Sequence, residues 1–312
     1  MRVVSLLPSA TEIAHAIGRG DSLVGVTHEC DYPHGVERLP HLTASLLSPE
    51  LSSREIDRQV SASLKADAHT IYGLDTEMLR ELKPDVILTQ ALCEVCAVPT
   101  SMVEEAVCTM PEGARIVSLD PLNLDAVFAS VEEAGDALDA QSEAREVAAR
   151  LRAEIAAIRD AVAGTSRPRV LAAEWLDPVY CGGHWVPEMI DIAGGIDSFG
   201  SPGEASHPLT WETVAAADPD VVVLMPCGYF APQIVERYHE IAAAPEWRGL
   251  RAVRERNVFA VDATSYFSRP GPRLVEGTRL LARILHPDRI DDKLVAGVAY
   301  RLQDDGTFIE FR

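Results

Sequence analysis

The sequence predicts an α/β protein built from two doubly wound lobes that are joined by a long rigid helix, with a ligand cleft between the lobes. Three observations predict this fold. Buried-strand runs alternate with helical segments in each half of the chain, the two halves resemble each other, and a proline-free helical segment separates them. A chain of 312 residues has room for two domains of ordinary size. Strands that alternate with helices imply a parallel sheet covered on both faces.

The first half reads as an amino-terminal lobe over residues 1–122. It opens with a buried strand at 2–7, and a helix follows in which Ser9 and Glu12 have the spacing of a capping box. Further strands and helices alternate after it. We expect strands at 21–27, 83–89 and 115–119, and helices at 53–66 and 76–82.

Residues 123–166 read as a connecting helical segment. Apolar residues recur at helical spacing, as in Val147, Leu151 and Ile155, which predicts one or two helices, the later one long. Such a helix is a stiff connector and not a flexible linker. The alternating pattern then restarts and gives a carboxy-terminal lobe over 167–290. The tail, 291–312, is expected to add a small pair of strands.

The two halves carry matching motifs. Lys-Pro-Asp-Val-Ile-Leu at 83–88 matches Asp-Pro-Asp-Val-Val-Val at 218–223, and each motif precedes a loop that contains cysteine. Residues 115–120 match 257–262 in the same way. This repetition indicates an ancient duplication.

Composition excludes several classes of function. A net charge of −20 argues against nucleic acid and against an anionic membrane surface, because both require clustered Lys and Arg. No run is long enough to span a membrane. The first eight residues end at Pro8 and do not form a signal peptide, so we expect a cytoplasmic protein. In a reducing compartment, the six cysteines are expected to be free thiols or metal ligands.

Several motifs, in order along the chain, resemble the cobalamin- and siderophore-binding class of ABC-transporter solute-binding proteins, which have a helical backbone between their lobes. The closest likeness is to the vitamin-B12-binding components. The motifs are Val-Val-Ser-Leu-Leu-Pro-Ser-Ala-Thr-Glu at 3–12, and the segments 21–27, 83–88, 211–220 and 247–253. The resemblance implies a ligand gripped between two lobes, aromatic side chains packed on it, and an ABC-type permease as partner.

In the loops that match the ligand site of this class, eight residues are candidates for ligand binding: Tyr32, Glu174, Trp175, His184, Trp185, Tyr229, Tyr266 and Arg269. Aromatic rings suit a flat conjugated ligand, and His184 could ligate the cobalt of a corrinoid. Arg269, close before the last helix, would make an anion site. The competing interpretations are core packing for the tryptophans, a backbone hydrogen bond for His184, and an acidic partner for Arg269. Trp211 and Trp247 are assigned to packing.

Cysteines form a second candidate site. Cys93 and Cys96 are one turn apart at an expected helix start, where the helix dipole lowers thiol pKa values. Cys30 and Cys227 follow strands whose carboxyl ends would share the same crevice, and His28 lies near Cys30. Together they could hold zinc or an iron–sulfur cluster, or the Cys93–Cys96 pair could work as a redox dithiol. Packing of small buried thiols is the competing interpretation.

These observations leave three hypotheses. The first is a solute-binding-like protein that holds cobalamin, a related corrinoid or another metal chelate between its lobes. The second is a cytoplasmic metalloprotein or enzyme with a cysteine-ligated zinc or iron–sulfur centre, and the third is a dithiol redox protein. The sequence has no Gly-x-Ser-x-Gly elbow, Walker loop or Gly-x-Gly-x-x-Gly motif, so hydrolase, kinase and dehydrogenase functions lack support.

Overall fold

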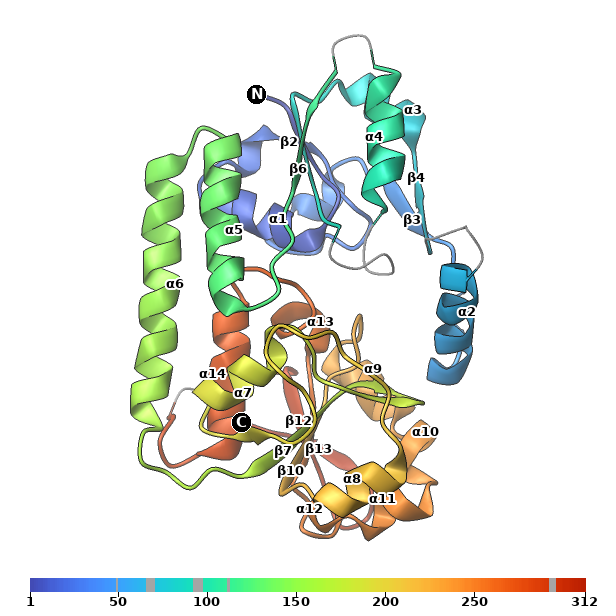
Figure 1. Ribbon diagram of the computed structural model, residues 1–312, viewed down its shortest axis with the longest axis vertical. Coiled ribbons are helices and arrows are strands. Elements are labelled where there is room, and N and C mark those ends of the chain that lie inside the picture. The colour runs from blue at the N-terminus through green and yellow to red at the C-terminus, as the bar shows by residue number, and fades with distance from the viewer. Residues whose placement is uncertain (49, 66–70, 92–97, 111–112, 292–295) are drawn as a thin grey trace.

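The computed structural model describes residues 1–48, 50–65, 71–91, 98–110, 113–291 and 296–312. Two α/β lobes lie one above the other, and α5 (Leu124–Ala137) and α6 (Gln141–Ala161) run together along one side of the molecule (Figure 1). The predicted fold, two doubly wound lobes with a long connecting helix, is confirmed. The single long helix of the connector is α6, with 21 residues.

The amino-terminal lobe is organised on a four-stranded parallel sheet in the order β2-β1-β5-β6. Its strands are β1 (Val3–Ser5), β2 (Leu23–Gly25), β5 (Val86–Thr89) and β6 (Arg115–Ser118). A separate antiparallel pair is formed by β3 (Thr43–Ser45) and β4 (Tyr72–Leu74). Its helices are α1 (Pro8–Ala16), α2 (Ser53–Lys65), α3 (Thr76–Leu82) and α4 (Thr100–Cys108), with short 3-10 turns at Gly20–Ser22 and Val36–Arg38.

The carboxy-terminal lobe has a larger mixed sheet in the order β13-β12-β11-β10-β7-β8, with β9 paired to β7. Its strands are β7 (Arg169–Leu176), β8 (Val179–Cys181), β9 (Ile196–Asp197), β10 (Val221–Leu224), β11 (Val258–Val261), β12 (Ala299–Leu302) and β13 (Phe308–Glu310). The last two are the strands expected in the tail, and they extend the sheet from β11 in antiparallel fashion.

Eight helices surround this sheet in the described part of the chain. They are α7 (Val186–Ile192), α8 (Trp211–Ala217), α9 (Ala231–Arg237), α10 (His239–Ala242), α11 (Pro245–Gly249), α12 (Arg251–Arg254), α13 (Ala263–Tyr266) and α14 (Leu274–Leu285). Trp247 is 1% exposed and Trp211 meets it edge-on at 5.6 Å between ring centroids, so the packing assigned to both is confirmed.

The repeated motif has the same geometry in both lobes. Lys83 ends α3 and Asp218 ends α8, both with a left-handed backbone (φ 44° and 45°) that stops the helix. Two residues later, Asp85 accepts a hydrogen bond from the backbone nitrogen of Arg2 at 2.6 Å, and Asp220 accepts one from Arg169 N at 2.7 Å. The matching helix ends, and the matching hydrogen bonds from each aspartate to a neighbouring strand, agree with duplication of one structural unit.

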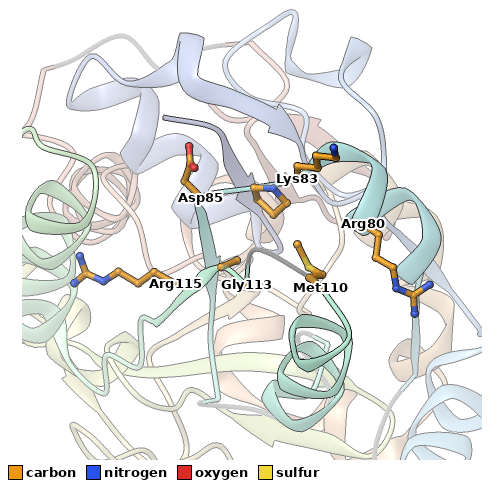
Figure 2. A pocket seen from close by; sticks show the side chains of 8 residues that line it. Arg80, Lys83, Asp85, Met110, Gly113 and Arg115 are labelled. Atoms are coloured by element: carbon orange, nitrogen blue, oxygen red, sulfur yellow. The ribbon is translucent and has the colours of Figure 1, made fainter.

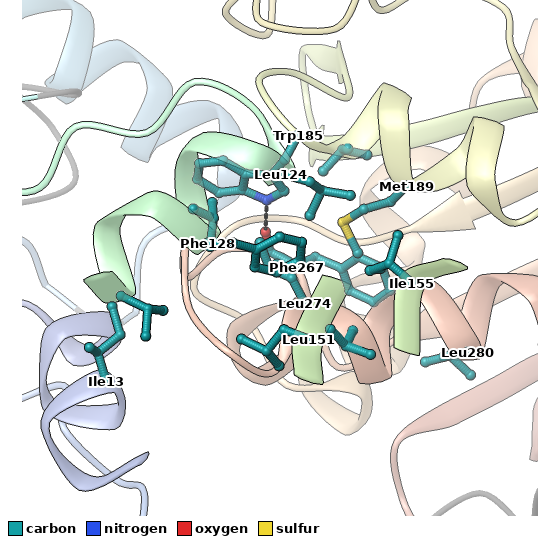
Figure 3. Packing of buried hydrophobic residues seen from close by; sticks show 14 of the residues in the cluster. Ile13, Leu124, Phe128, Leu151, Ile155, Trp185, Met189, Phe267, Leu274 and Leu280 are labelled. Atoms are coloured by element: carbon teal, nitrogen blue, oxygen red, sulfur yellow. Dashed lines mark hydrogen bonds between the residues drawn. The ribbon is translucent and has the colours of Figure 1, made fainter. Parts of the chain in front are cut away.

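One hydrophobic cluster runs through both lobes on the side of α5 and α6. It joins Ile13 of α1 to Leu124 and Phe128 of α5, and continues to Met189 of α7 and Leu274 of α14 (Figure 3). Burial of this much apolar surface is the dominant stabilising term in such a junction. The lobes are therefore fused along this side by shared core packing as well as by the connecting chain.

The capping box predicted at the start of the first helix is wrong. Helix α1 begins at Pro8 with Leu7 as its N-cap, and no side chain caps it. Proline suits this position because its missing N–H would have no partner in the first turn. Glu12 is instead 4% exposed and turned toward the other lobe, where it pairs with arginine.

Candidate functional site

Loops from the two lobes meet where their parallel strands end. Arg269, which follows β11 and α13, pairs with Asp31 and donates to the carbonyl oxygen of Glu29 at 2.9 Å. Asp31 and Glu29 lie in the loop after β2. Carboxyl ends of parallel strands are where open α/β sheets form their sites. These contacts show that the two sets of loops face each other, as the sequence predicted.

An ion cluster that is buried except at Asp31 crosses this inter-lobe face. Glu12 Oε1 accepts from Arg273 Nη2 at 2.6 Å, Glu12 Oε2 accepts from Arg273 Nε at 3.0 Å, and Arg269 Nη1 lies 3.4 Å from Glu12 Oε1. We call Glu12, Asp31, Arg269 and Arg273 the inter-lobe ion cluster. Two carboxylates balance two guanidinium groups, so the cluster has no net charge.

Two tyrosines flank the cluster. The guanidinium carbon of Arg273 lies 4.3 Å from the ring centroid of Tyr32 and 5.7 Å from that of Tyr266, distances at which a cation is attracted to an aromatic face. Tyr32 comes from the amino-terminal lobe and Tyr266 from α13. Tyr32 remains 48% exposed, so part of its surface is open to a partner.

The side chain of Arg269, predicted as an anion site, faces acidic groups in the structure. Its side chain is 9% exposed and is occupied by Asp31, Glu12 and a backbone carbonyl. A guanidinium whose donors already face carboxylates has little left to offer an anionic ligand. The competing interpretation, an arginine paired with nearby acids, is the one observed.

A second aromatic pair lies on the carboxy-terminal lobe. The rings of Trp175 and Tyr229 are 5.9 Å apart, and the guanidinium of Arg237 lies 4.9 Å from the Tyr229 ring centroid. Burial raises the pKa of the Tyr229 hydroxyl, which keeps it protonated. Trp175 donates its indole N–H to the carbonyl oxygen of Ser53 at 3.0 Å, a contact that also crosses between lobes.

His184 has an unusual backbone for its residue type. Its φ is +52°, a left-handed conformation that costs free energy for a side chain larger than glycine. Its ring is half-buried and lies 5.6 Å from the ring of Trp185. Desolvation lowers the pKa of His184, so the imidazole is neutral near pH 7 and able to act as a ligand.

Trp185 is a core residue and not part of a ligand-facing wall. It is 6% exposed, and its indole N–H donates to the carbonyl oxygen of Phe267 at 2.8 Å, the dashed contact in Figure 3. The ring packs within the shared cluster beside Leu124. Because its N–H already has an acceptor and its ring is buried, Trp185 packs in the core and does not make the expected contact with ligand.

Glu174 supports a tight turn. Its Oε1 accepts from the backbone nitrogen of Gly183 at 3.1 Å, and its carbonyl accepts from Cys227 N at 3.1 Å. Gly183 has no room for a side chain, because an added Cβ would lie 2.3 Å from Ser206 N. Glu174 therefore holds the backbone that presents His184.

Among the described residues, the cysteines and His28 do not form a metal site. Cys30 is 3% exposed, shares a hydrogen bond with Thr11 Oγ1 at 3.1 Å, and burial raises its pKa to about 11. His28 turns elsewhere, with Nδ1 2.7 Å from Thr43 Oγ1 and its ring 5.6 Å from that of Tyr72. Cys227 is exposed.

Cys93 and Cys96 lie outside the described residues. Within the residues that are described, no group of three or more His, Cys, Asp or Glu side chains is arranged to hold a metal ion. Neither of the cysteine-based hypotheses gains support from the structure.

A pocket of about 480 Å³ lies away from the inter-lobe face. It is lined by Arg80, Lys83, Asp85, Met110 and Arg115, among others, at the amino-terminal starts of β5 and β6 (Figure 2). Ligand sites in parallel sheets form at the opposite ends of the strands. This pocket is therefore not part of the candidate site.

Two features of the site were not predicted from the sequence: the ion pair between Glu12 and Arg273, and the contact of α2 with the other lobe. Because Glu12 stands three residues after Ser9, the sequence suggests an ordinary capping residue and gives no sign of the ion pair. A signal for Arg273 did exist, since it stands one turn after Arg269 next to the start of the last helix.

Comparison with known proteins decides the family. The sequence profile of the family described as periplasmic binding protein matches residues 3–264. This chain belongs to that family. An uncharacterised ABC transporter substrate-binding lipoprotein of Bacillus subtilis, YvrC, is 24% identical over 295 residues, which cover 92% of this chain and 80% of the relative.

Two similar proteins are named for the ligands that they bind. The vitamin B12-binding protein of Yersinia pestis is 24% identical over 232 residues, covering 72% of this chain and 69% of that protein. The crystal structure of a periplasmic heme-binding protein from Pseudomonas aeruginosa superposes with a TM-score of 0.71 at 21% identity, covering 96% of each chain. The family relationship accounts for the predicted fold. In the described part of this chain, no helix has the length and apolar character needed to cross a membrane.

Proposed function

We propose that this periplasmic binding protein family member binds a corrinoid such as cobalamin between its lobes, as the substrate-binding component of an ABC importer. The Yersinia relative is a vitamin B12-binding protein and the Pseudomonas neighbour is heme-binding, so both ligands are candidates. Each is a flat, conjugated macrocycle with a central metal. The two ligands differ in the charge of the side groups at the edge of the macrocycle.

The observation that carries the choice is the state of the inter-lobe arginines. In the described part of the chain, guanidinium contacts between the lobes come from Arg54, Arg237, Arg269 and Arg273, and each of these faces a carboxylate. Heme carries two propionate groups that require cationic or hydrogen-bonding partners. A corrin ring carries uncharged amides, and cyanocobalamin has no net charge. A site whose cations are already neutralised favours the uncharged edge.

Two side chains supply what a corrinoid needs. Tyr32 offers an exposed aromatic face next to the inter-lobe ion cluster. His184 offers a neutral imidazole, a common ligand for transition metals such as cobalt. Its left-handed backbone is the kind of strain that accumulates at binding sites.

The test is a calorimetric titration of the protein with cyanocobalamin and, separately, with hemin. We expect a dissociation constant on the order of 1 µM or lower for cyanocobalamin, and at least about tenfold weaker binding of hemin. Tyr32→Ala should weaken the corrinoid complex, whereas Ile309→Ala, an equally exposed apolar residue on the terminal strand β13, should leave it unchanged. Stronger binding of hemin than of cyanocobalamin would contradict the choice of ligand.

Aquacobalamin tests the role of His184. Its upper axial water can be exchanged for an imidazole, so binding to the wild type should shift the visible absorption bands. Cyanocobalamin, whose upper position is blocked, should show no such shift. The band shift should be lost in His184→Ala. If the shift persists in that variant, His184 is not the ligand of the cobalt.

A further inference from the structure

Helix α2 belongs to the amino-terminal lobe by chain connection but rests on the carboxy-terminal lobe. In Figure 1 it lies on the side of the molecule opposite α5 and α6. Arg54 of α2 forms a two-pronged ion pair with Asp177 in the turn between β7 and β8, with Nε–Oδ2 and Nη2–Oδ1 both 2.8 Å. Such a fork-to-fork pair fixes orientation as well as position.

Four more polar contacts hold the first half of α2 and the segment just before it to the same lobe. Tyr180 donates its hydroxyl to Asp57 Oδ1 at 3.0 Å, and Trp175 donates its indole N–H to the Ser53 carbonyl at 3.0 Å. Glu240 accepts from the backbone nitrogen of Ser53 at 3.2 Å. Just before the helix, the Leu51 carbonyl accepts from Arg237 Nη2 at 2.9 Å.

This attachment differs in kind from the one on the opposite side. Along α5 and α6 the lobes share a continuous apolar core. The apolar residues Ile56 and Val60 of α2 are only half-buried, and Arg54 is 76% exposed. The contact of α2 is therefore largely polar and partly open to water, although Ser53 at its start is buried. Polar, solvent-exposed contacts belong to the low-stability end of a structure and open before its core does.

The attachment also involves the aromatic pair of the candidate site. Trp175, which is hydrogen-bonded to α2, has its ring centroid 5.9 Å from that of Tyr229. The guanidinium of Arg237, which is hydrogen-bonded to the segment before α2, lies over the Tyr229 ring. Undocking of α2 would therefore break the hydrogen bond of the Trp175 indole N–H and at the same time uncover one side of the inter-lobe face.

We propose that α2 is a clasp that undocks from the carboxy-terminal lobe to let ligand in or out and then docks again. This inference rests on the proposed function, because it assumes a ligand between the lobes. The fused side along α5 and α6 stays closed during exchange. The clasp therefore sets the rates of association and dissociation more than the affinity, since it must open in both directions.

The test compares a clasp variant, Arg54→Ala with Tyr180→Phe, to a matched control, Arg58→Ala, on the same helix. Arg58 is exposed and takes part in none of the contacts with the carboxy-terminal lobe described above. Hydrogen exchange of the α2 backbone, measured without ligand, should accelerate about tenfold or more in the clasp variant and match the wild type in the control. Circular dichroism checks that both variants fold.

Stopped-flow tryptophan quenching with cyanocobalamin then measures ligand exchange. We expect the association and dissociation rates to rise by a similar factor in the clasp variant, with the dissociation constant changed by less than about threefold. Unchanged exchange of α2, or faster α2 opening with unchanged ligand rates, would overturn the clasp. If the wild type does not bind corrinoid, but hydrogen exchange of α2 still accelerates in the clasp variant, the result counts against the proposed ligand and not against the docking of α2.

Discussion

Removing one carboxylate should reveal how strongly the inter-lobe ion cluster stabilises the protein. Glu12 accepts both hydrogen bonds that Arg273 makes within the cluster, and the two side chains are 3% and 13% exposed. In Glu12→Gln, the buried guanidinium of Arg273 loses the carboxylate that accepts both of its hydrogen bonds, whereas Arg269 keeps its ion pair with Asp31. Breaking one side of a buried pair costs about 3–5 kcal/mol, and we expect that loss in the free energy of unfolding.

Urea unfolding followed by circular dichroism measures this loss. The matched control is Asp304→Asn, which removes the partner of Arg256 in an exposed pair and should cost less than about 1 kcal/mol. The double variant Glu12→Gln with Arg273→Gln removes both charges and should be more stable than the sum of the single effects predicts. A cost for Glu12→Gln no larger than that of the control would refute the reasoning.

Three further predictions follow from burial. Iodoacetamide at pH 8, read out by mass spectrometry, should label the exposed Cys108 and Cys227 and leave Cys30 unlabelled; labelling of native Cys30 would contradict its pKa of about 11. Because burial raises that pKa from 9.0, the native state holds the proton longer than the unfolded state, so wild-type stability should fall relative to Cys30→Ala as pH rises from 9 to about 11. Trp185→Ala should cost roughly 3–5 kcal/mol in unfolding free energy, measured by urea titration, and a loss below about 1 kcal/mol would contradict its place in the core.

The strands and helices were predictable because their signals are local. The buried run at 86–89 is apolar on both faces of a covered sheet, and the left-handed stops at Lys83 and Asp218 each precede Pro-Asp and a strand. The motif order likewise indicated the family. Secondary structure and family membership could therefore be predicted from short stretches of chain.

The site was harder to predict because its decisive contacts join distant residues. Arg269 looks available in the sequence, but its partners Glu12 and Asp31 lie more than 230 residues earlier. Trp185 looks like a ligand-facing aromatic beside two glycines, but Phe267 supplies its hydrogen-bond acceptor. No local pattern distinguishes a paired arginine from a free one, or a packed indole from an exposed one.

The two attachments between the lobes limit what motion the molecule can make. Opening along α5 and α6 would expose the shared apolar cluster, with a cost that grows with every buried side chain separated. The inter-lobe ion cluster adds buried charges that would need rehydration. The docked α2 breaks mainly polar contacts when it moves, and water replaces those hydrogen bonds at a modest net cost. Ligand exchange by movement of α2 thus requires less free energy than exchange by separation of whole lobes.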